Sequence, residues 1–447
     1  MVNSTKISFK EIRILAIPAI FAGIAEPIIG LVDTAVIGNL GENSEISQAA
    51  VGLGAAFYTL LLWCLSQIRT SISSIVSKYV GAEKVSDIKS LVPQTILFGA
   101  MLGVIVGGIS FLFSPSIFLD FYGVDSTDKE LLEKAIQYFN IRIIGLPISM
   151  IVYTVFGVFR GMQNTIWIMQ ASIFGAIMNV ILDYILVFGV GDFYPNMGIE
   201  GVAWASVFAQ FTMLLIVAIT VKRKTEFSII PSWSKPNPEF KTMLLMSANM
   251  LIRTLALNLA FFLANRYATS YGKSYLAAHT ILINLWVFSF FFIDGFSNAG
   301  NAISGKLLGK KDFKALTLLS KDLVKYNSIV AGVLALIFVL LYPFLGRIFS
   351  NDSEVVAHFY SVFWLIIVAQ FVSGITFTYD GIFKGLGETA YLRNTLIVAT
   401  LFLFVPVIFV LDLFDFNLYA IWIAFLVWNM FRGGSLIYKF RKKYRTI

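Results

Sequence analysis

Two aspartates, Asp33 and Asp183, stand inside apolar stretches that are long enough to cross a membrane. A bare carboxylate costs about 2.5 to 3.5 kcal/mol at the centre of a membrane helix, so such a residue usually faces a cavity and binds a ligand there. Asn179 precedes Asp183 by four residues in MNVILD, which puts an amide and a carboxylate on one helix face, about 6 Å apart along the axis. The spacing predicts a polar site built from these oxygens.

Further charged side chains are expected inside the apolar stretches. In the first half of the chain we count three acids, Glu26, Asp33 and Asp183, against one arginine, Arg69. Even if Arg69 pairs with one carboxylate, another should be protonated or hold a cation once water is excluded. The second half contributes three more residues, for which ligand contact and structural pairing both stay open: Arg253, Asp294 and Asp380.

The amino-acid composition indicates whether this chain is a soluble protein or lies in a membrane. Hydrophobic residues make up 58% of the 447 positions and charged residues only 13%, which leaves too little polar surface for a soluble protein of this size. One cysteine and two histidines argue against a disulfide framework and against a typical zinc or redox centre. The net charge of +8 is scattered over short loops, so membrane topology explains it better than nucleic-acid binding. We expect an integral membrane protein.

Apolar windows of about 20 residues predict twelve membrane-spanning helices. Lysines and arginines gather in the loops that follow the even-numbered spans, so the positive-inside rule places both termini in the cytoplasm. This topology predicts a multi-pass protein of the inner (cytoplasmic) membrane. The expected spans are 12–38, 49–76, 92–118, 132–158, 166–190, 199–221, 242–269, 275–303, 322–345, 355–381, 391–411 and 416–437.

The chain also repeats itself at about half its length. FRGMQNT, which begins at Phe159, returns as FKGLGET 224 residues later, and Gly81 matches Gly309 at an offset of 228. Because each half has six spans, both halves begin on the same side of the membrane. An axis along the membrane normal should therefore relate them. We therefore predict an N-lobe at 1–221, a proline-rich cytoplasmic linker at 222–241 and a C-lobe at 242–447.

Several of these segments resemble one family. LAIPAI and IIGLVDTAVIGNLG in the first span, MNVILDYILVFG, GIEGVAWASVF and FRGMQNT are similar to the multidrug and toxic compound extrusion (MATE) family along nearly the whole chain. Span seven carries Arg253 and Asn258 but no glutamate of the kind used in the NorM branch, so the prokaryotic DinF-like branch fits better. The resemblance implies an all-α membrane protein with twelve helices in two pseudo-symmetric six-helix lobes. It also implies an antiporter, not an enzyme, that exports amphipathic, often cationic compounds in exchange for protons or sodium.

Site residues follow from the same resemblance, position by position. The proton or sodium site would comprise Asp33, Asn179, Asp183 and Ser206, where serine stands for the family's threonine, and Pro18 would be the hinge of the first span. No cofactor beyond H⁺ or Na⁺ and no other metal is expected. The partners would be small molecules and the lipid bilayer, with no nucleic acid, and the protein would be a monomer. We expect four residues to line the substrate cavity: Glu26, Arg69, Tyr138 and Asp294.

Two other classes of function remain open at this stage. A flippase for lipid-linked oligosaccharides or polysaccharides, from the same superfamily, would have similar composition and symmetry. Such proteins typically carry basic residues in the central cavity, whereas the charges counted in the first half are net acidic, which favours cation export. A channel or membrane enzyme is the weaker alternative, because no nucleophile and base motif, metal cluster or phosphate-binding glycine loop is present.

Overall fold

The computed structural model describes residues 7–39, 44–189, 196–230 and 235–444, and the regular structure in these ranges is helical. The side chain of Glu26 lies outside the described residues. The first half contains α1 (Phe9–Gly38), α2 (Ser44–Leu65), α3 (Ile68–Gly81), α4 (Leu91–Leu112), α5 (Ser114–Ser116), α6 (Lys129–Arg142), α7 (Leu146–Gly161), α8 (Ile166–Phe188) and α9 (Gly198–Lys224). The second half contains α10 (Phe240–Tyr271), α11 (Lys273–Lys310), α12 (Phe313–Leu340), α13 (Tyr342–Phe349), α14 (Ser353–Gly385), α15 (Thr389–Val398), α16 (Val405–Asp412) and α17 (Leu418–Tyr444).

Twelve helical segments of the described chain are long and apolar enough to cross a membrane, which confirms the predicted number. Some spans consist of two helices joined by a short 3-10 or π turn. Leu146 and Pro147 open α7 after the turn Ile143–Gly145, and Pro406 lies at the start of α16 after Ala399–Phe404. Proline is tolerated at these places because the first helical N–H groups have no intrahelical acceptor.

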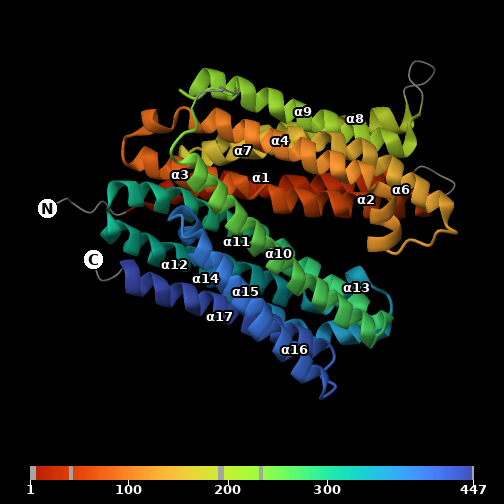
Figure 1. Ribbon diagram of the computed structural model, residues 1–447. Coiled ribbons are helices and arrows are strands. Elements are labelled where there is room, and N and C mark those ends of the chain that lie inside the picture. Colours follow the sequence, from red (N-terminus) through yellow and green to blue (C-terminus); the bar gives the residue numbers. More distant parts are fainter. Residues whose placement is uncertain (1–6, 40–43, 190–195, 231–234, 445–447) are drawn as a thin grey trace. The chain divides into compact units, whose positions relative to one another are not determined.

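The helices pack into two compact units. Unit 1 contains residues 1–20, 77–83 and 245–447, and unit 2 contains residues 21–76 and 84–244. Within unit 2, α8 packs along α9 and α4 along α7, while α11, α14 and α17 pack together in unit 1 (Figure 1). The division falls inside α1, two residues after Pro18. The lobe boundaries expected from the sequence, 1–221, 222–241 and 242–447, stay a prediction.

The two sequence repeats correspond to one helix crossing in each half. In α7, a Cβ on Gly161 would approach the Ser73 carbonyl oxygen of α3 to 2.9 Å, closer than real Cβ atoms come. In α14, a Cβ on Gly385, which lies 224 residues later, would collide with the Asn301 carbonyl oxygen of α11. Asn301 in turn follows Ser73 by 228 residues. Small residues let membrane helices approach backbone to backbone, which is why the repeated glycines mark these crossings.

Asn237 is a buried residue of the segment predicted to be the linker, and it bonds to the chain just before α4. Asn237 Nδ2 donates to the Asp87 carbonyl oxygen at 2.9 Å and to Ser90 Oγ at 3.0 Å. Its backbone N–H donates to Gln94 Oε1, also at 2.9 Å. At the surface, Lys89 pairs with Glu226 at 2.7 Å, and this ammonium lowers the pKa of the Glu226 carboxyl. All of these contacts lie within unit 2.

We expect Asn237→Ala to release the linker from this anchor, because three hydrogen bonds at a buried position are lost or weakened. Limited trypsin digestion, with the cuts between Lys222 and Lys241 mapped by mass spectrometry, should proceed at least about fivefold faster than in the wild type. Ser228→Ala is the matched control, since Ser228 is exposed and its hydrogen bonds to described residues stay within its own turn. Equal digestion rates for both variants would contradict the anchoring role.

Candidate functional site

The oxygens expected to form a polar site meet inside unit 2. Asp33 of α1 interacts with the side chains of Asp183 and Asn179 of α8, and all three are buried, with 6%, 0% and 0% of their surface exposed. Across the α8–α9 contact, Asn179 Nδ2 lies 3.5 Å from Ser206 Oγ. The four residues predicted to form this site therefore lie together.

The carboxylates of Asp33 and Asp183 face each other without enough donors between them. Oδ1 of Asp33, both carboxylate oxygens of Asp183 and Oδ1 of Asn179 are buried, and within the described part of the chain none of them receives a hydrogen bond. Two ionised carboxylates side by side repel each other, and burial removes the water that would screen them. A proton shared by the pair, or a cation among these oxygens, satisfies both requirements.

A second layer of polar side chains lies beside this pair. Arg142 of α6 acts electrostatically on both Asp33 and Asp183, and it interacts with the buried hydroxyl of Tyr138 on the same helix. Its guanidinium also lies 4.0 Å from the ring centroid of Tyr58 on α2. Such a face-on contact stabilises the cation. Among the described residues, Arg142 is therefore the arginine whose charge acts on both carboxylates.

Gln210 of α9 connects this layer to the neighbouring helices. With its amide nitrogen donating to the Gly145 carbonyl oxygen at 3.0 Å, its oxygen accepts from Tyr58 Oη at 2.9 Å, from Ser149 Oγ at 3.2 Å and from Arg142. In this orientation the Gly145 carbonyl oxygen receives a hydrogen bond. In the opposite orientation it would face the side-chain oxygen of Gln210. Tyr58 Oη and Ser149 Oγ are themselves 3.1 Å apart. The network orients Arg142 and Tyr58 at the edge of the site.

Glycines allow these helices to come close enough for the site to form. A Cβ on Gly201 of α9 would lie 2.8 Å from the Leu186 carbonyl of α8, so the two backbones meet close to Ser206 along the same helix. A Cβ on Gly54 of α2 would lie 2.5 Å from the ring of Tyr138. Without a side chain at these two positions, α8 approaches α9 and Tyr138 packs against α2.

Of the four residues predicted to line a substrate cavity, three have side chains that the structure describes. Tyr138 lies in the layer beside the carboxylate pair, and Arg69 of α3 lies over the ring of Tyr153, 5.1 Å from its centroid. Asp294 belongs to unit 1, where it accepts a hydrogen bond from Asn298 at 3.0 Å. Glu26 cannot be placed, because its side chain is outside the described residues. A cavity lined by these four residues stays a prediction.

The count of one arginine against three acids in the first half was wrong. Arg142 lies inside the stretch expected as span four and stands next to Asp33 and Asp183, and Arg160 near the end of α7 is buried as well. In the second half the count missed Arg432, which is also buried. These three arginines could have been found from the sequence, because each is a charged residue within or beside an apolar stretch. Counting Arg142 reduces the excess of acids over arginines within these spans from two to one, so the charge balance separates cation export from a flippase less clearly.

Asp380, whose role the sequence left open, is the centre of a second buried cluster, in unit 1. Its Oδ1 accepts from Arg253 Nη2 of α10 at 2.5 Å, and its Oδ2 pairs with Lys384 Nζ at 2.6 Å. Arg432 of α17 lies 3.8 Å from the same carboxylate. The cluster links α10, α14 and α17.

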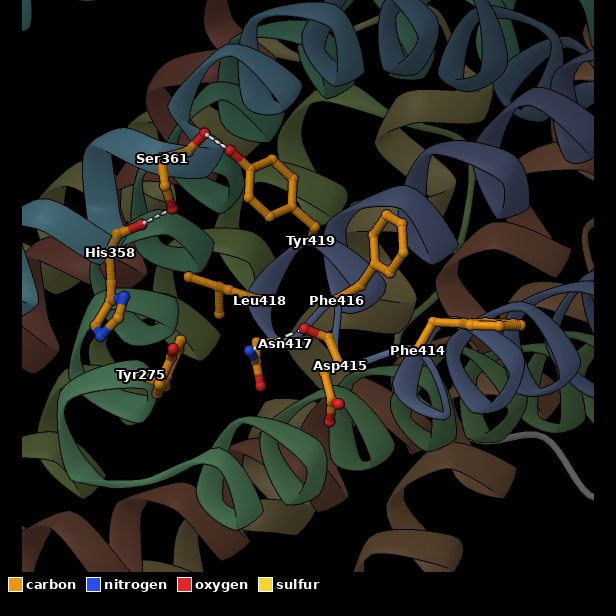
Figure 2. Close-up of a pocket in the computed structure, with 9 residues that line it drawn as sticks. All are labelled: Tyr275, His358, Ser361, Phe414, Asp415, Phe416, Asn417, Leu418 and Tyr419. Atoms are coloured by element: carbon orange, nitrogen blue, oxygen red, sulfur yellow. Dashed lines mark hydrogen bonds between the residues drawn. The ribbon is translucent and has the colours of Figure 1, made fainter.

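An open cavity of about 450 Å³ lies at the loop end of unit 1, and none of the predicted site residues lines it. Figure 2 shows two hydrogen bonds that join its lining residues: Tyr419 Oη donates to the Ser361 carbonyl oxygen and Ser361 Oγ donates to the His358 carbonyl oxygen, both at 2.7 Å. The His358 ring stacks on Tyr275 with centroids 3.7 Å apart. These contacts join the ends of α11, α14 and α17 to one another and leave no unpaired carboxylate like those of Asp33 and Asp183 among the residues named, so the buried carboxylate pair is the stronger candidate site.

Comparison with known proteins identifies the family. The family model MatE matches residues 18–185 and 250–410, which includes Asp33, Asn179 and Asp183. The chain belongs to the MatE family. DNA damage-inducible protein F of Escherichia coli strain K12 is 27% identical over 98% of this MatE chain and 93% of its own length. Multidrug resistance protein NorM of Photobacterium profundum is 22% identical, over 91% and 88%. The expected MATE membership, with similarity to the DinF protein, is confirmed, and this MatE chain is a transporter, not an enzyme.

Solved structures show the same fold. A crystal structure of MATE in the bent conformation superposes with a TM-score of 0.89 at 21% identity, over 98% of this MatE chain and 95% of that chain. A MOP superfamily transporter from Pyrococcus furiosus superposes with a TM-score of 0.87 at 20% identity, over 98% and 96%. The predicted architecture of a MatE protein with twelve membrane-spanning helices is confirmed.

Proposed function

We propose that this MatE transporter is a cation-coupled antiporter that exports amphipathic small molecules by alternating access. The observation that carries the proposal is the buried pair of Asp33 and Asp183, in which Oδ1 of Asp33 and both oxygens of Asp183 have no hydrogen-bond donor within the described chain. Export of drug-like compounds agrees with the name of the NorM relative, a multidrug resistance protein.

Charge balance gives the stoichiometry. Asp33 and Asp183 contribute two negative charges when ionised and Arg142 contributes one positive charge, so a single proton or Na⁺ neutralises the group. Asn179 and Ser206 add uncharged oxygens, and a hard monovalent cation prefers an all-oxygen set of this kind. In a membrane potential, one charge contributes about 2.3 kcal/mol per 100 mV.

Coupling requires that the ion favours one conformation. Shifting a two-state equilibrium from 1:99 to 99:1 takes about 5.5 kcal/mol of differential binding. Asp33 lies on α1, which carries Pro18 and Pro27 and passes from unit 1 to unit 2 at residues 20 and 21. A bend of α1 at Pro27, which lies within unit 2 between the division and Asp33, would move the Asp33 carboxylate relative to Asp183 and make ion binding depend on conformation.

The apolar part of an exported compound has a place on the same two helices. A cavity of about 200 Å³ has an apolar lining from one face of α1 and one face of α8, the helices that carry Asp33 and Asp183. The lining residues are Phe21, Ile24, Ala25, Ile28, Ile173, Ala176 and Ile177.

Export direction and location complete the proposal. The basic loops after even-numbered spans place both termini in the cytoplasm, so compounds would leave through the inner membrane while the coupling ion enters. We propose a monomer as the working unit, since the carboxylate site lies entirely within unit 2 of one chain.

The test uses purified protein in vesicles loaded with a cationic rhodamine ester, with a proton or a sodium gradient imposed alone. If neither gradient drives efflux, the proposal is overturned. Asn179→Ala separates the two ions, because an amide oxygen can bind Na⁺ but is not needed to hold a proton between carboxylates. Losing a contact to a charged group costs about 1.5 to 3 kcal/mol, so sodium-driven efflux should fall at least about tenfold.

Proton-driven efflux of the same variant should change less than about threefold, the change expected from small packing effects alone. Asn265→Ala, at an exposed position of α10, is the control for protein quality. A loss of the same size with both ions would show that Asn179 supports the structure of the site and does not select sodium.

A further inference from the structure

The cluster around Asp380 holds more positive than negative charge. Three cations, Arg253, Lys384 and Arg432, share this one carboxylate, and within the described part of the chain all of their salt bridges end on it. The side chains of Arg253, Arg432 and Asp380 are only 9%, 4% and 6% exposed. Burying an uncompensated charge costs several kcal/mol, so a cluster with two surplus cations is poised to take up an anion.

Of the three cations, Arg432 lies farthest from the Asp380 carboxylate. Asp380 Oδ1 is occupied by Arg253 at 2.5 Å and Oδ2 by Lys384 at 2.6 Å, whereas Arg432 lies beyond hydrogen-bond distance at 3.8 Å. The other guanidinium nitrogen of Arg432 donates to Asn429 Oδ1 at 3.1 Å. Each oxygen of Asp380 therefore already has a closer cation than Arg432.

The surroundings hold Arg432 in a fixed orientation. Its guanidinium lies 4.3 Å from the ring centroid of Trp428, and Trp428 Nε1 donates to Thr400 Oγ1 at 3.0 Å. Asn429 Nδ2 donates to Ser373 Oγ, also at 3.0 Å. A planar guanidinium that its neighbours hold in place matches the fork of a carboxylate or phosphate group.

Lys384 is the member of the cluster that a ligand can reach first. Lys384 has 17% of its side chain exposed, more than the other three members, and it lies one residue before the end of α14. An ammonium on a flexible stem can leave Asp380 and turn to an incoming anion without moving a helix.

We propose that the cluster of Arg253, Lys384 and Arg432 around Asp380 binds the anionic group, a carboxylate or phosphate, of an exported amphiphile. The inference rests on the proposed export function and deepens it, because it assigns zwitterionic or anionic compounds as a substrate class beside the cations that the carboxylate pair suits. Arg432 contacts the ligand, Lys384 closes over it, and Asp380 keeps the cations in place when no ligand is bound.

The experiment measures equilibrium binding, so it does not depend on whether export is ion-coupled. The full-length protein is placed in nanodiscs of phosphatidylcholine and titrated with two rhodamines, one with a free carboxylate and one with the same group as its ethyl ester. We expect the wild type to bind the free carboxylate at least about tenfold more tightly than the ester. Arg432→Gln should remove this preference and leave ester binding within about twofold.

Three further variants keep the result interpretable. Arg432→Lys, which retains the charge, should keep most of the preference, and Lys384→Gln should reduce it about fivefold even if Arg432→Gln does not fold. Arg441→Gln removes one positive charge from the exposed surface of the same helix and should bind both dyes like the wild type. Equal affinity of the wild type for the two dyes, or an unchanged preference in Arg432→Gln and Lys384→Gln, would overturn the proposal.

Lipid headgroups carry the same anionic chemistry, so the measurement is repeated with phosphatidylglycerol added to the nanodiscs. A preference for the free carboxylate that survives this addition supports a site for exported compounds. If phosphatidylglycerol abolishes the preference in the wild type, an anionic lipid occupies the cluster and the proposed substrate class is wrong.

Discussion

Asp33→Asn should reduce gradient-driven efflux at least about a hundredfold, because removing one carboxylate ends the need for a coupling ion. With Asp33 neutral, Asp183 and Arg142 balance each other's charge, and no proton or Na⁺ has to enter the site. Losing about 2.7 kcal/mol of the roughly 5.5 kcal/mol that a full population shift requires corresponds to this factor. The measurement is efflux from vesicles with an imposed gradient, compared with binding of the same compound to the purified variant.

Binding should persist in Asp33→Asn, since asparagine has nearly the size of aspartate and the fold around it is unchanged. Glu133→Gln is the control, because Glu133 is exposed on α6, the helix that carries Tyr138 and Arg142. Asp183→Asn should behave as Asp33→Asn does, by the same charge balance. Coupled efflux at the wild-type rate in either aspartate variant would remove that residue from the coupling mechanism.

Gly385→Ala should destabilise the protein by about 1 to 3 kcal/mol, the usual cost of overpacking a tight contact. Its new Cβ would collide with the Asn301 carbonyl oxygen of α11, and a backbone atom in a helix cannot move aside as a flexible side chain can. We expect a melting temperature several degrees below that of the wild type, measured by thermal unfolding of the purified protein in detergent.

Gly434→Ala makes the same chemical change where nothing lies within 4 Å of the new methyl group. It should be neutral or stabilise α17 by up to about 1 kcal/mol, because alanine favours a helix over glycine. Opposite signs for the two substitutions are the expected result. If Gly385→Ala unfolded at or above the wild-type temperature, the close approach of α11 and α14 would not matter for stability.

The twelve spans were predictable because a membrane imposes a simple rule on sequence. Every backbone polar group in lipid must be hydrogen-bonded within its own helix, so a span can be recognised in the sequence as an apolar run of about 20 residues. The same logic made Asp33 and Asp183 visible, since a carboxylate in such a run is costly, and helical spacing put Asn179 beside Asp183. Ser206 was added by resemblance to the MATE family, and the structure places it 3.5 Å from Asn179.

Partners across helices were less accessible from sequence. Arg69 was the one arginine counted beside the acids of the first half, yet it lies over Tyr153, and it is Arg142 that acts electrostatically on Asp33 and Asp183. Arg432 was overlooked in the same way, although it joins the cluster of Asp380. One-dimensional patterns tell which residues are costly to bury, but the residue that offsets the cost comes from another helix at no fixed distance along the chain.

For this protein, the sequence alone determined that the chain lies in a membrane, how many spans it has, where it repeats itself and which two residues form the carboxylate pair. These properties depend on hydrophobicity and local helical periodicity. Tertiary packing decided which cation stands next to which acid, how Gln210 connects Gly145 to Tyr58, and that three cations share Asp380. Those outcomes depend on how closely helices approach, which residues such as Gly201 and Gly385 permit by lacking a side chain at the contact.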